Sequence, residues 1–442
     1  MQTKKITYLL VFTILYFLIP ACNSSNNTAP VSNDSFSFTP LPSSSGLPLN
    51  ANTVQNWIDT GNDEAIRNHA LEIWKALNTS SGQIFQGREL PVWETWYSGD
   101  EIYDSQSACS STQRPSATTN FENPRQLFKH NVADEATSSF NKFDGLYAQN
   151  VCDNLYNNPN TLTALNQSFT PSTPIIDRSI QGFALGTTAL KPVFMLVSQS
   201  GLTSIPYWNG AENSTNFAMP SSNTWTQCVA VDPSPNPHYA DLHKTVNQSC
   251  NGTNTNQQVV SINQFYHFAL SQGDIDNLSG FAPSQELAGA KVGDFAILVA
   301  MHVTMKEVPQ WVWQTFWWEP NAANTPFPAE ERPAKTLNKI PNPFNNYAMC
   351  TAYQMVIPEV TGTTPKICFN PYLEPGLTGV VGKESNCMTC HSLATWGNGG
   401  PFGGGLDYQT NGYIDQGSSL FSDVTKLDFL WSVTRASDNS SN

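Results

Sequence analysis

Two cysteines and a histidine stand together near the C-terminus, in the run Cys387-Met388-Thr389-Cys390-His391. This C-x-x-C-H spacing is the attachment signature of c-type haem. On a helix, positions i, i+3 and i+4 share one face, so both sulfurs can bond the haem vinyl groups as thioethers while the imidazole reaches the iron. The sequence therefore predicts one covalent haem c, with His391 as the proximal iron ligand.

Two other chemistries use the same residue types. A bare C-x-x-C can be a thiol–disulfide redox pair. It can also be half of a zinc site, although the sequence has no second C-x-x-C or H-x-x-x-H to complete one. Haem is favoured because the N-terminus predicts export to a compartment where such haem is attached and thiols are not kept reduced.

The N-terminus has the pattern of an export signal. Lys4 and Lys5 precede an apolar run over residues 6–19, and the run is short for a membrane span. The cysteine after Ala21 resembles a bacterial lipobox, which implies that Cys22 becomes the lipidated first residue of the mature chain. Asn23 then implies a periplasm-facing lipoprotein of the bacterial cell envelope, sorted to the outer membrane. The alternative is an uncleaved signal anchor, and no other stretch is apolar for long enough to span a bilayer.

Composition divides the remainder of the chain. A stretch rich in Ser, Asn and Pro follows Cys22, so residues 23–50 are expected to form a flexible tether behind the signal peptide of residues 1–22. We expect an α+β fold with two domains. Residues 51–339 would form a β-rich domain of unknown function with a few helices. Residues 340–442, rich in Asn, Pro and Gly, would form a small, mostly α-helical haem domain.

The chain is acidic, with a formal net charge of −14. Such a charge argues against nucleic-acid binding and against adhesion to anionic lipid. It fits a basic redox partner protein of the cell envelope, and it leaves the lipid on Cys22 as the expected contact with the membrane.

The nine cysteines can all be assigned. Cys22 goes to lipid, and Cys387 and Cys390 go to haem. An even remainder of six in an exported protein predicts three disulfides. Because the six cluster as neighbours along the chain, we expect the pairs Cys109–Cys152, Cys228–Cys250 and Cys350–Cys368.

Local patterns predict several elements. Asn62 would cap a helix that continues to Leu77, because the apolar residues recur at helical spacing. Residues 295–306 and 311–318 would form a hairpin, and residues 190–199 a buried strand. We also expect a strand over residues 91–97 and helices that begin at Ser261 and Ser422.

The stretch from Cys387 to Gly403 resembles class I cytochrome c. In that family a Gly-Pro lies about a dozen residues after the haem histidine, and the proline carbonyl accepts the Nδ1–H of that histidine. Pro401 occupies the corresponding place, so the resemblance implies this role for it, although an ordinary Gly-rich turn is the alternative. The predicted terminal helix, which carries Trp431, also resembles the C-terminal helix of the family.

The mature chain further resembles a group of uncharacterised bacterial proteins of the "cytochrome c family". The matching pieces are Ala189-Leu190-Lys191-Pro192-Val193-Phe194, Ala300-Met301-His302-Val303-Thr304 and Trp311-Val312-Trp313-Gln314-Thr315-Phe316. The resemblance implies haem binding and electron transfer, without a known reaction.

The sixth iron ligand departs from the class I pattern. Class I cytochromes take a methionine well after the haem motif, whereas this chain has no methionine after Met388. The candidates are therefore His302, Met349 and Met355, or an open position. A thioether raises the reduction potential relative to an imidazole, and an open position permits small-molecule binding or peroxide chemistry.

Three functions are compatible with these patterns. The first is an exported monohaem cytochrome that carries electrons. The second is a single-haem oxidase, peroxidase or sensor with an open iron position. The third is a binding module in which the tryptophan-rich stretch around Trp311 and Trp313 stacks on glycans. No catalytic carboxylate pair can be chosen from the sequence, and it has no phosphate-binding loop or serine nucleophile elbow.

Overall fold

The structure is a computed structural model, which describes residues 35–104, 107–109, 138–139, 141–156, 162–210, 224–235, 242, 244–279, 289–321, 326–357, 364–374, 385–397 and 412–434. Cys22, with the expected signal peptide, and Pro401 lie outside these residues. Within them the fold is mixed α+β.

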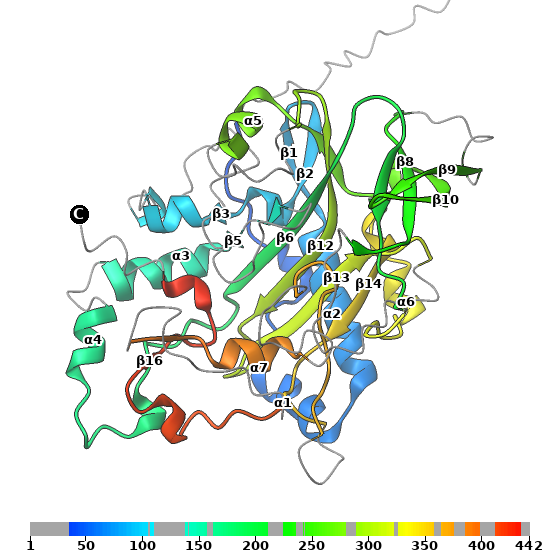
Figure 1. Cartoon of the computed structure of the whole chain (residues 1–442). Helices are drawn as coiled ribbons and strands as arrows, with labels where there is room; N and C mark the ends of the chain where they lie inside the picture. Colours follow the sequence, from blue (N-terminus) through cyan, green and yellow to red (C-terminus); the bar gives the residue numbers. More distant parts are fainter. Residues whose placement is uncertain are drawn as a thin grey trace, which may run out of the picture.

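An antiparallel sheet of eight strands forms the centre of the molecule (Figure 1). Its main order is β14-β13-β12-β6-β5-β3, with β11 paired to β12 and β4 to β6. The long central strands are apolar on both faces, which is typical of strands that are covered on both sides. The strands are β3 (Tyr97–Ser98), β4 (Ser138–Ser139), β5 (Lys142–Phe143), β6 (Thr188–Val197), β11 (His267–Ala269), β12 (Phe295–Met305), β13 (Val312–Trp318) and β14 (Tyr347–Thr351).

Smaller sheets surround the central one. A four-stranded sheet of order β7-β8-β10-β9 stands to the right in Figure 1. It comprises β7 (Thr203–Pro206), β8 (Cys228–Asp232), β9 (Thr245–Cys250) and β10 (Thr253–Ser261). Two antiparallel pairs complete the sheets. β1 (Ser80–Phe85) pairs with β2 (Arg88–Pro91), and β15 (Thr395–Trp396) pairs with β16 (Thr425–Lys426).

The longest described helix covers one face of the central sheet. The side chain of Asn62 caps α2 by accepting a hydrogen bond from the Ala65 N–H at 3.2 Å. Trp74 of α2 stacks on Phe316 of β13, with ring centroids 4.1 Å apart. The α-helices are α1 (Ala51–Thr60), α2 (Asp63–Leu77), α3 (Gly145–Val151), α4 (Leu162–Ser168), α5 (Gln272–Ser279), α6 (Ala334–Leu337) and α7 (Cys387–Ser392).

The mostly helical C-terminal domain is not supported. After residue 340, the described chain first forms β14, which pairs with β13 and so extends the central sheet. Its α-helix in this region is α7, of six residues, and the other described elements are strands and short 3₁₀ turns. One hydrophobic core contains residues from Val54 to Val433. The expected boundary at residue 340 therefore falls inside a continuous core rather than between two bodies.

The described part of the expected tether packs on the body of the molecule. Phe36 is 2% exposed and contacts Phe85, with ring centroids 5.0 Å apart. The Thr39 carbonyl accepts a hydrogen bond from the Trp96 indole N–H at 2.9 Å. Phe36 is buried, and Phe38, Leu41, Leu47 and Leu49 are half-buried against the core, so residues 35–50 do not form a free linker.

Several local predictions are confirmed and three are wrong. The helix over residues 63–77, the strand over 188–197 and the hairpin of β12 and β13 are present. Residues 92–95 form a 3₁₀ helix instead of a strand. Ser261 caps a 3₁₀ turn of three residues, after which the chain enters β11. After Ser422 the chain forms β16 and short turns in place of a terminal helix.

The six remaining cysteines lie in the three pairs that their order suggested. The structure joins Cys109 to Cys152, Cys228 to Cys250 and Cys350 to Cys368, with Cα–Cα distances of 5.3, 5.7 and 5.7 Å.

Candidate haem-attachment site

Asn386 anchors the helix that carries the cysteine motif. Its Oδ1 accepts a hydrogen bond from the Thr389 N–H at 3.0 Å and so caps the N-terminus of α7. Its Nδ2 donates to the carbonyls of Gln354 and Lys366, at 3.0 and 2.6 Å. The first turn of α7 is thereby fixed to the chain that follows β14, and Cys387 and Cys390 lie one turn apart on it.

Cys387 and Cys390 carry thiols outside the three disulfides. The Cys387 Sγ lies 3.6 Å from the carbonyl oxygen of Cys368. Burial raises the pKa of the Cys387 thiol well above its ordinary value, and the charges of Glu374 and Cys390 add to this effect. A thiol–disulfide redox pair needs a thiolate with a lowered pKa. The surroundings of Cys387 therefore count against the redox-pair interpretation of the motif.

His391 is held by a backbone carbonyl and an indole ring. Its Nδ1 lies 2.8 Å from the Phe429 carbonyl oxygen, an acceptor, so Nδ1 carries the proton and the lone pair is on Nε2. The Trp313 ring packs against the imidazole, with centroids 4.1 Å apart and planes at 33°. This tautomer is the one that a metal bound at Nε2 requires.

Within the described residues, the backbone carbonyl at His391 Nδ1 comes from Phe429. The resemblance to class I cytochrome c implied that the Pro401 carbonyl accepts the Nδ1–H of the histidine. In the structure the Phe429 carbonyl has that position. Pro401 lies outside the described residues. Phe429 was missed because a backbone carbonyl leaves no mark on the side-chain pattern.

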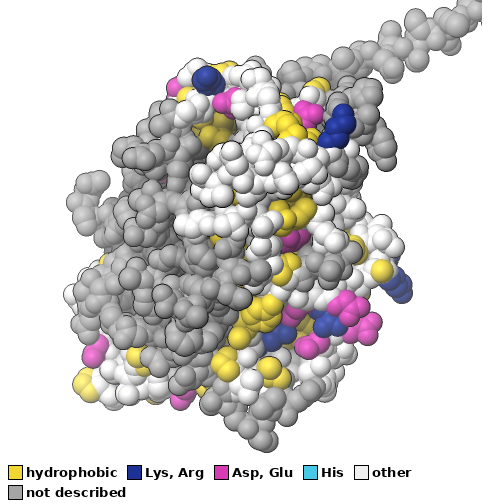
Figure 2. Space-filling view, turned by 45° about the vertical axis from the view of Figure 1, so that its right-hand side comes forward, with side chains coloured by type: hydrophobic (Ala, Val, Ile, Leu, Met, Phe, Trp, Pro, Cys, Tyr) yellow, Lys and Arg dark blue, Asp and Glu magenta, His cyan; other side chains and the backbone are white. Residues whose placement is uncertain are grey.

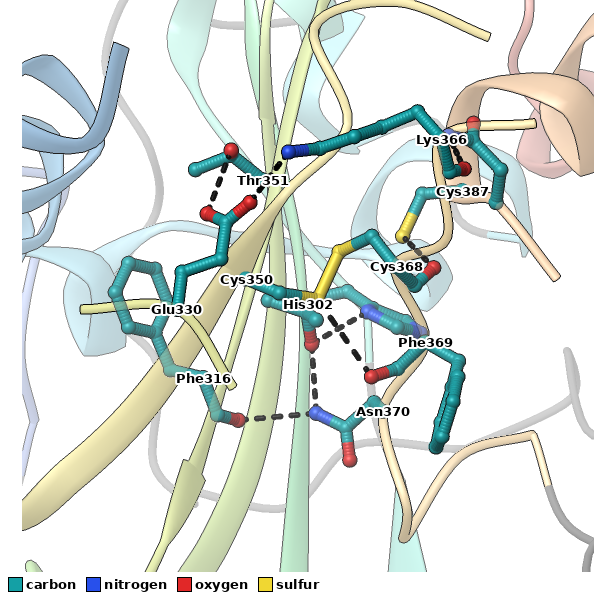
Figure 3. The surroundings of a disulfide bond; sticks show 12 residues. His302, Phe316, Glu330, Cys350, Thr351, Lys366, Cys368, Phe369, Asn370 and Cys387 are labelled. Atoms are coloured by element: carbon teal, nitrogen blue, oxygen red, sulfur yellow. Dashed lines mark hydrogen bonds and ion pairs between the residues drawn. A yellow bond between two sulfur atoms is a disulfide. The ribbon is translucent and has the colours of Figure 1, made fainter. Parts of the chain in front are cut away.

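His302 lies on the face of the sheet that is turned towards α7. His302 of β12 pairs with Thr315, and Thr304 pairs with Trp313, so these side chains share the face that contacts His391. Both ring nitrogens of His302 are engaged: Nδ1 lies 2.9 Å from Thr315 Oγ1, and Nε2 lies 2.8 Å from Glu374 Oε1. Figure 3 shows His302 beside the Cys350–Cys368 disulfide and Asn370, with Cys387 nearby.

The two methionine candidates differ in position. Met349 pairs with Phe316, and Phe316 stacks on Trp74 of α2, so Met349 is on the sheet face that is turned away from α7. It is fully buried there and is not placed to reach a group bound at His391. Met355 lies near the start of α7, where its Sδ accepts a hydrogen bond from the Ile414 N–H at 3.3 Å.

The tryptophan-rich strand is interior. Trp311, Trp317 and Trp318 are fully buried and Trp313 is 4% exposed. They build the core and the wall beside His391, so they do not offer the exposed stacking platform that the glycan hypothesis needs.

The described residues fit a covalently attached haem. Two thiols one helical turn apart face the same side as an imidazole whose Nδ1 proton is already placed, which is the donor set that the group requires. A search of the described residues found no cluster of three or more His, Cys, Asp or Glu side chains arranged to hold a metal ion by themselves.

Comparisons with known proteins add no family. The chain was compared with protein-family models, with curated proteins and with solved structures, and nothing matched. Among the described helices, none combines the length and the apolar character needed to cross a membrane.

Proposed function

We propose that the chain is an exported monohaem c-type cytochrome that transfers electrons in the bacterial cell envelope. One observation carries the proposal. The C-x-x-C-H run forms a capped helical turn whose cysteines stay outside the disulfides, and its histidine has Nδ1 tied to a carbonyl, which orients Nε2 for a metal.

The two cysteines and the histidine of the turn each have a role in this proposal. Cys387 and Cys390 would hold the porphyrin through thioether bonds, and His391 would supply a nitrogen ligand to its iron. The bound group supplies one-electron chemistry between ferrous and ferric iron. Trp313 excludes water from one side of the imidazole, and the Phe429 carbonyl raises its basicity. The resemblance to class I cytochrome c supports the haem, and it does not extend to a separate helical domain.

We propose His302 as the sixth ligand, with Met355 as the alternative. His302 shares the face of the sheet that contacts His391, and its Nε2 must leave Glu374 to bind a metal. Exposure of the reduced protein to CO tests this assignment. Slow or absent CO binding, which becomes fast in His302→Ala, supports a six-coordinate carrier. Fast binding by the wild type supports the oxidase, peroxidase or sensor instead.

The proposed location is the outer membrane, through a lipid on Cys22, with the folded body in the periplasm. The proposed partner is a redox protein of the cell envelope with a basic docking face, because the net charge of the chain is −14. In the view of Figure 2, the acidic and basic side chains of the described residues are interspersed.

The direct test uses a host that is competent for cytochrome maturation. The purified wild type is expected to show a Soret band and a haem stain that survives denaturation. Cys387→Ser and Cys390→Ser are expected to lose the stain, each weakening or abolishing the covalent link. Cys228→Ser, in the Cys228–Cys250 disulfide, is the matched control and should keep it. Equal staining of all four proteins, or none in the wild type, contradicts the proposal.

A further inference from the structure

A buried ion pair joins the end of β12 to the C-terminal segment beside the motif. Lys306 Nζ lies 2.7 and 2.9 Å from the two carboxylate oxygens of Asp428. The two side chains are 8% and 11% exposed. Lys306 also donates to the Pro309 carbonyl at 2.8 Å, and its ammonium lies 5.2 Å from the ring centroid of Trp311. The pair is thus enclosed by the turn that leads into β13.

The chain at Asp428 has an unusual backbone conformation. Asp428 and Phe429 have φ angles of 46° and 69°, in the left-handed region that residues with a Cβ seldom adopt. Two successive residues of this kind persist only where the surroundings determine them. Here the Leu430 N–H closes the turn by donating to the Leu427 carbonyl at 3.0 Å. The side chain inside the turn is fixed as well, because the Asp428 carboxylate accepts from Lys306 and, at 2.9 Å, from the Phe183 N–H.

This conformation places one atom of the candidate site. It turns the Phe429 carbonyl towards α7, where the oxygen lies 2.8 Å from His391 Nδ1. On the other side of the same imidazole, Trp313 is held by its indole N–H, which donates to the Gln310 carbonyl at 2.9 Å. The segment from Lys306 to Trp313 therefore reaches His391 in two ways, directly through Trp313 and indirectly through Asp428.

We propose that Lys306 and Asp428 are positioning residues for His391, which keep the Phe429 carbonyl on its Nδ1 proton. The inference rests on the proposed function, because it assigns these residues to the tuning of a haem ligand. A buried ion pair is weak support for stability alone, since desolvation offsets most of its attraction. Asp428, however, directly precedes Phe429, whose carbonyl contacts His391 Nδ1. The ion pair can therefore hold that carbonyl in place.

The holoprotein test measures the midpoint potential of Lys306→Met and Asp428→Asn. A histidine that donates Nδ1–H to a carbonyl is a more basic ligand and favours ferric iron. Loss of that bond is expected to shift the equilibrium about tenfold towards ferrous iron, which raises the midpoint by ~59 mV. Glu94→Gln is the matched control, because it removes the carboxylate of another ion pair, that of Arg88 and Glu94. It should keep the wild-type midpoint. Unchanged midpoints in both test variants overturn the inference.

A second measurement needs no haem. Cys387→Ser/Cys390→Ser protein labelled with ¹⁵N-histidine should show His391 as the Nδ1–H tautomer with a slowly exchanging proton. Adding Asp428→Asn should give a tautomer mixture with fast exchange. If adding Asp428→Asn leaves the His391 signal unchanged, the positioning role is contradicted. This result can be obtained even if Asp428→Asn yields no holoprotein, because the labelled protein carries no haem. If the wild type carries no haem but the signal responds as described, the proposed function fails while the positioning contact stands.

Discussion

At the scale of single residues, the environment of Cys387 bears on the redox-pair interpretation of the motif. The sequence offers haem, a redox pair or half a zinc site for the same C-x-x-C. Burial raises the pKa of the Cys387 thiol, and a nucleophilic redox cysteine requires the opposite. The neighbouring His391 has its Nδ1 tied to Phe429, which a redox pair does not need and a proximal ligand does.

Asp144 gives a prediction at the same scale. This carboxyl caps α3 by accepting from the Tyr147 N–H, and it also accepts from the Thr188 N–H. Burial raises its pKa from 3.8 to about 7. Between these values the folded protein keeps a proton that the unfolded chain has released, so this carboxyl contributes less stability as the pH rises from 4 to 7.

The comparison of wild type with Asp144→Asn isolates that contribution. Asn keeps a cap acceptor and does not titrate. The unfolding free energy of the wild type minus that of Asp144→Asn should fall from pH 4 to pH 7 and level off above. Chemical denaturation at several pH values measures it. A flat difference for Asp144→Asn across this range would refute the shift.

At the scale of elements, α7 owes its position to tertiary contacts. A helix of six residues is too short to be stable alone. Asn386 supplies its cap and also satisfies the carbonyls of Gln354 and Lys366. The helix therefore depends on one side chain that bridges three segments.

Substitutions at Asn386 should show graded losses of stability. Asn386→Ala removes the cap of α7 and the donor to two carbonyls. It should lower the free energy of unfolding by about 3 kcal/mol. Asn386→Ser keeps a cap acceptor and should cost less. Asn50→Ala removes the cap of α1 alone and should cost about 1 kcal/mol. Chemical denaturation measures both variants. If Asn386→Ala and Asn50→Ala lower the free energy of unfolding equally, the bonds from Asn386 to the Gln354 and Lys366 carbonyls contribute no stability.

Elements with a strong local pattern were predictable and the others were not. The helix after Asn62 has a cap, acidic residues in its first turn and an apolar stripe, so local and tertiary preferences agree. The segment after Ser261 has helical spacing, but pairing of β11 with β12 recruits it into the central sheet. Likewise Thr425 and Lys426 pair with β15, which ends the expected terminal helix. Tertiary pairing overrides a short local signal in both cases.

The same reasoning explains which parts of the site could be predicted. Cys387, Cys390 and His391 form a contiguous run whose spacing indicates the chemistry. His302 could be named as a candidate, but its partner Glu374 lies 72 residues away in the chain. The Phe429 carbonyl and the Lys306–Asp428 pair could not be predicted, since they depend on backbone angles and on contacts between distant segments.

At the scale of the whole molecule, a single core connects the candidate site to the rest of the chain. The central sheet has α2 on one face and the motif helix α7 on the other, with Phe316 and Trp313 of β13 turned towards them respectively. The chain before residue 340 therefore builds one wall of the site. This arrangement gives the large N-terminal part a structural reason to accompany the haem motif.

Two of the disulfides should contribute equally to stability but differently to the candidate site. Cys350 and Cys368 are 18 residues apart, and Cys228 and Cys250 are 22 apart. Removing either pair by alanine substitution should therefore lower the free energy of unfolding by about 3 kcal/mol.

Of these two pairs, Cys350–Cys368 borders the motif, because the Cys368 carbonyl contacts Cys387 and the Cys368 N–H donates to the Ser385 carbonyl. Loss of the first pair should reduce haem content per chain, measured by absorbance, while loss of the second should not. Equal haem content in both would contradict this link.

The mass of the proteolytic fragment that contains residues 387–391, prepared from protein matured with haem available, tests the central claim most directly. The account predicts a fragment heavier than its amino acids by one haem, with fragmentation that places the added mass on Cys387 and Cys390. A fragment with the mass of its amino acids alone, or one with a disulfide between these cysteines, would contradict the account.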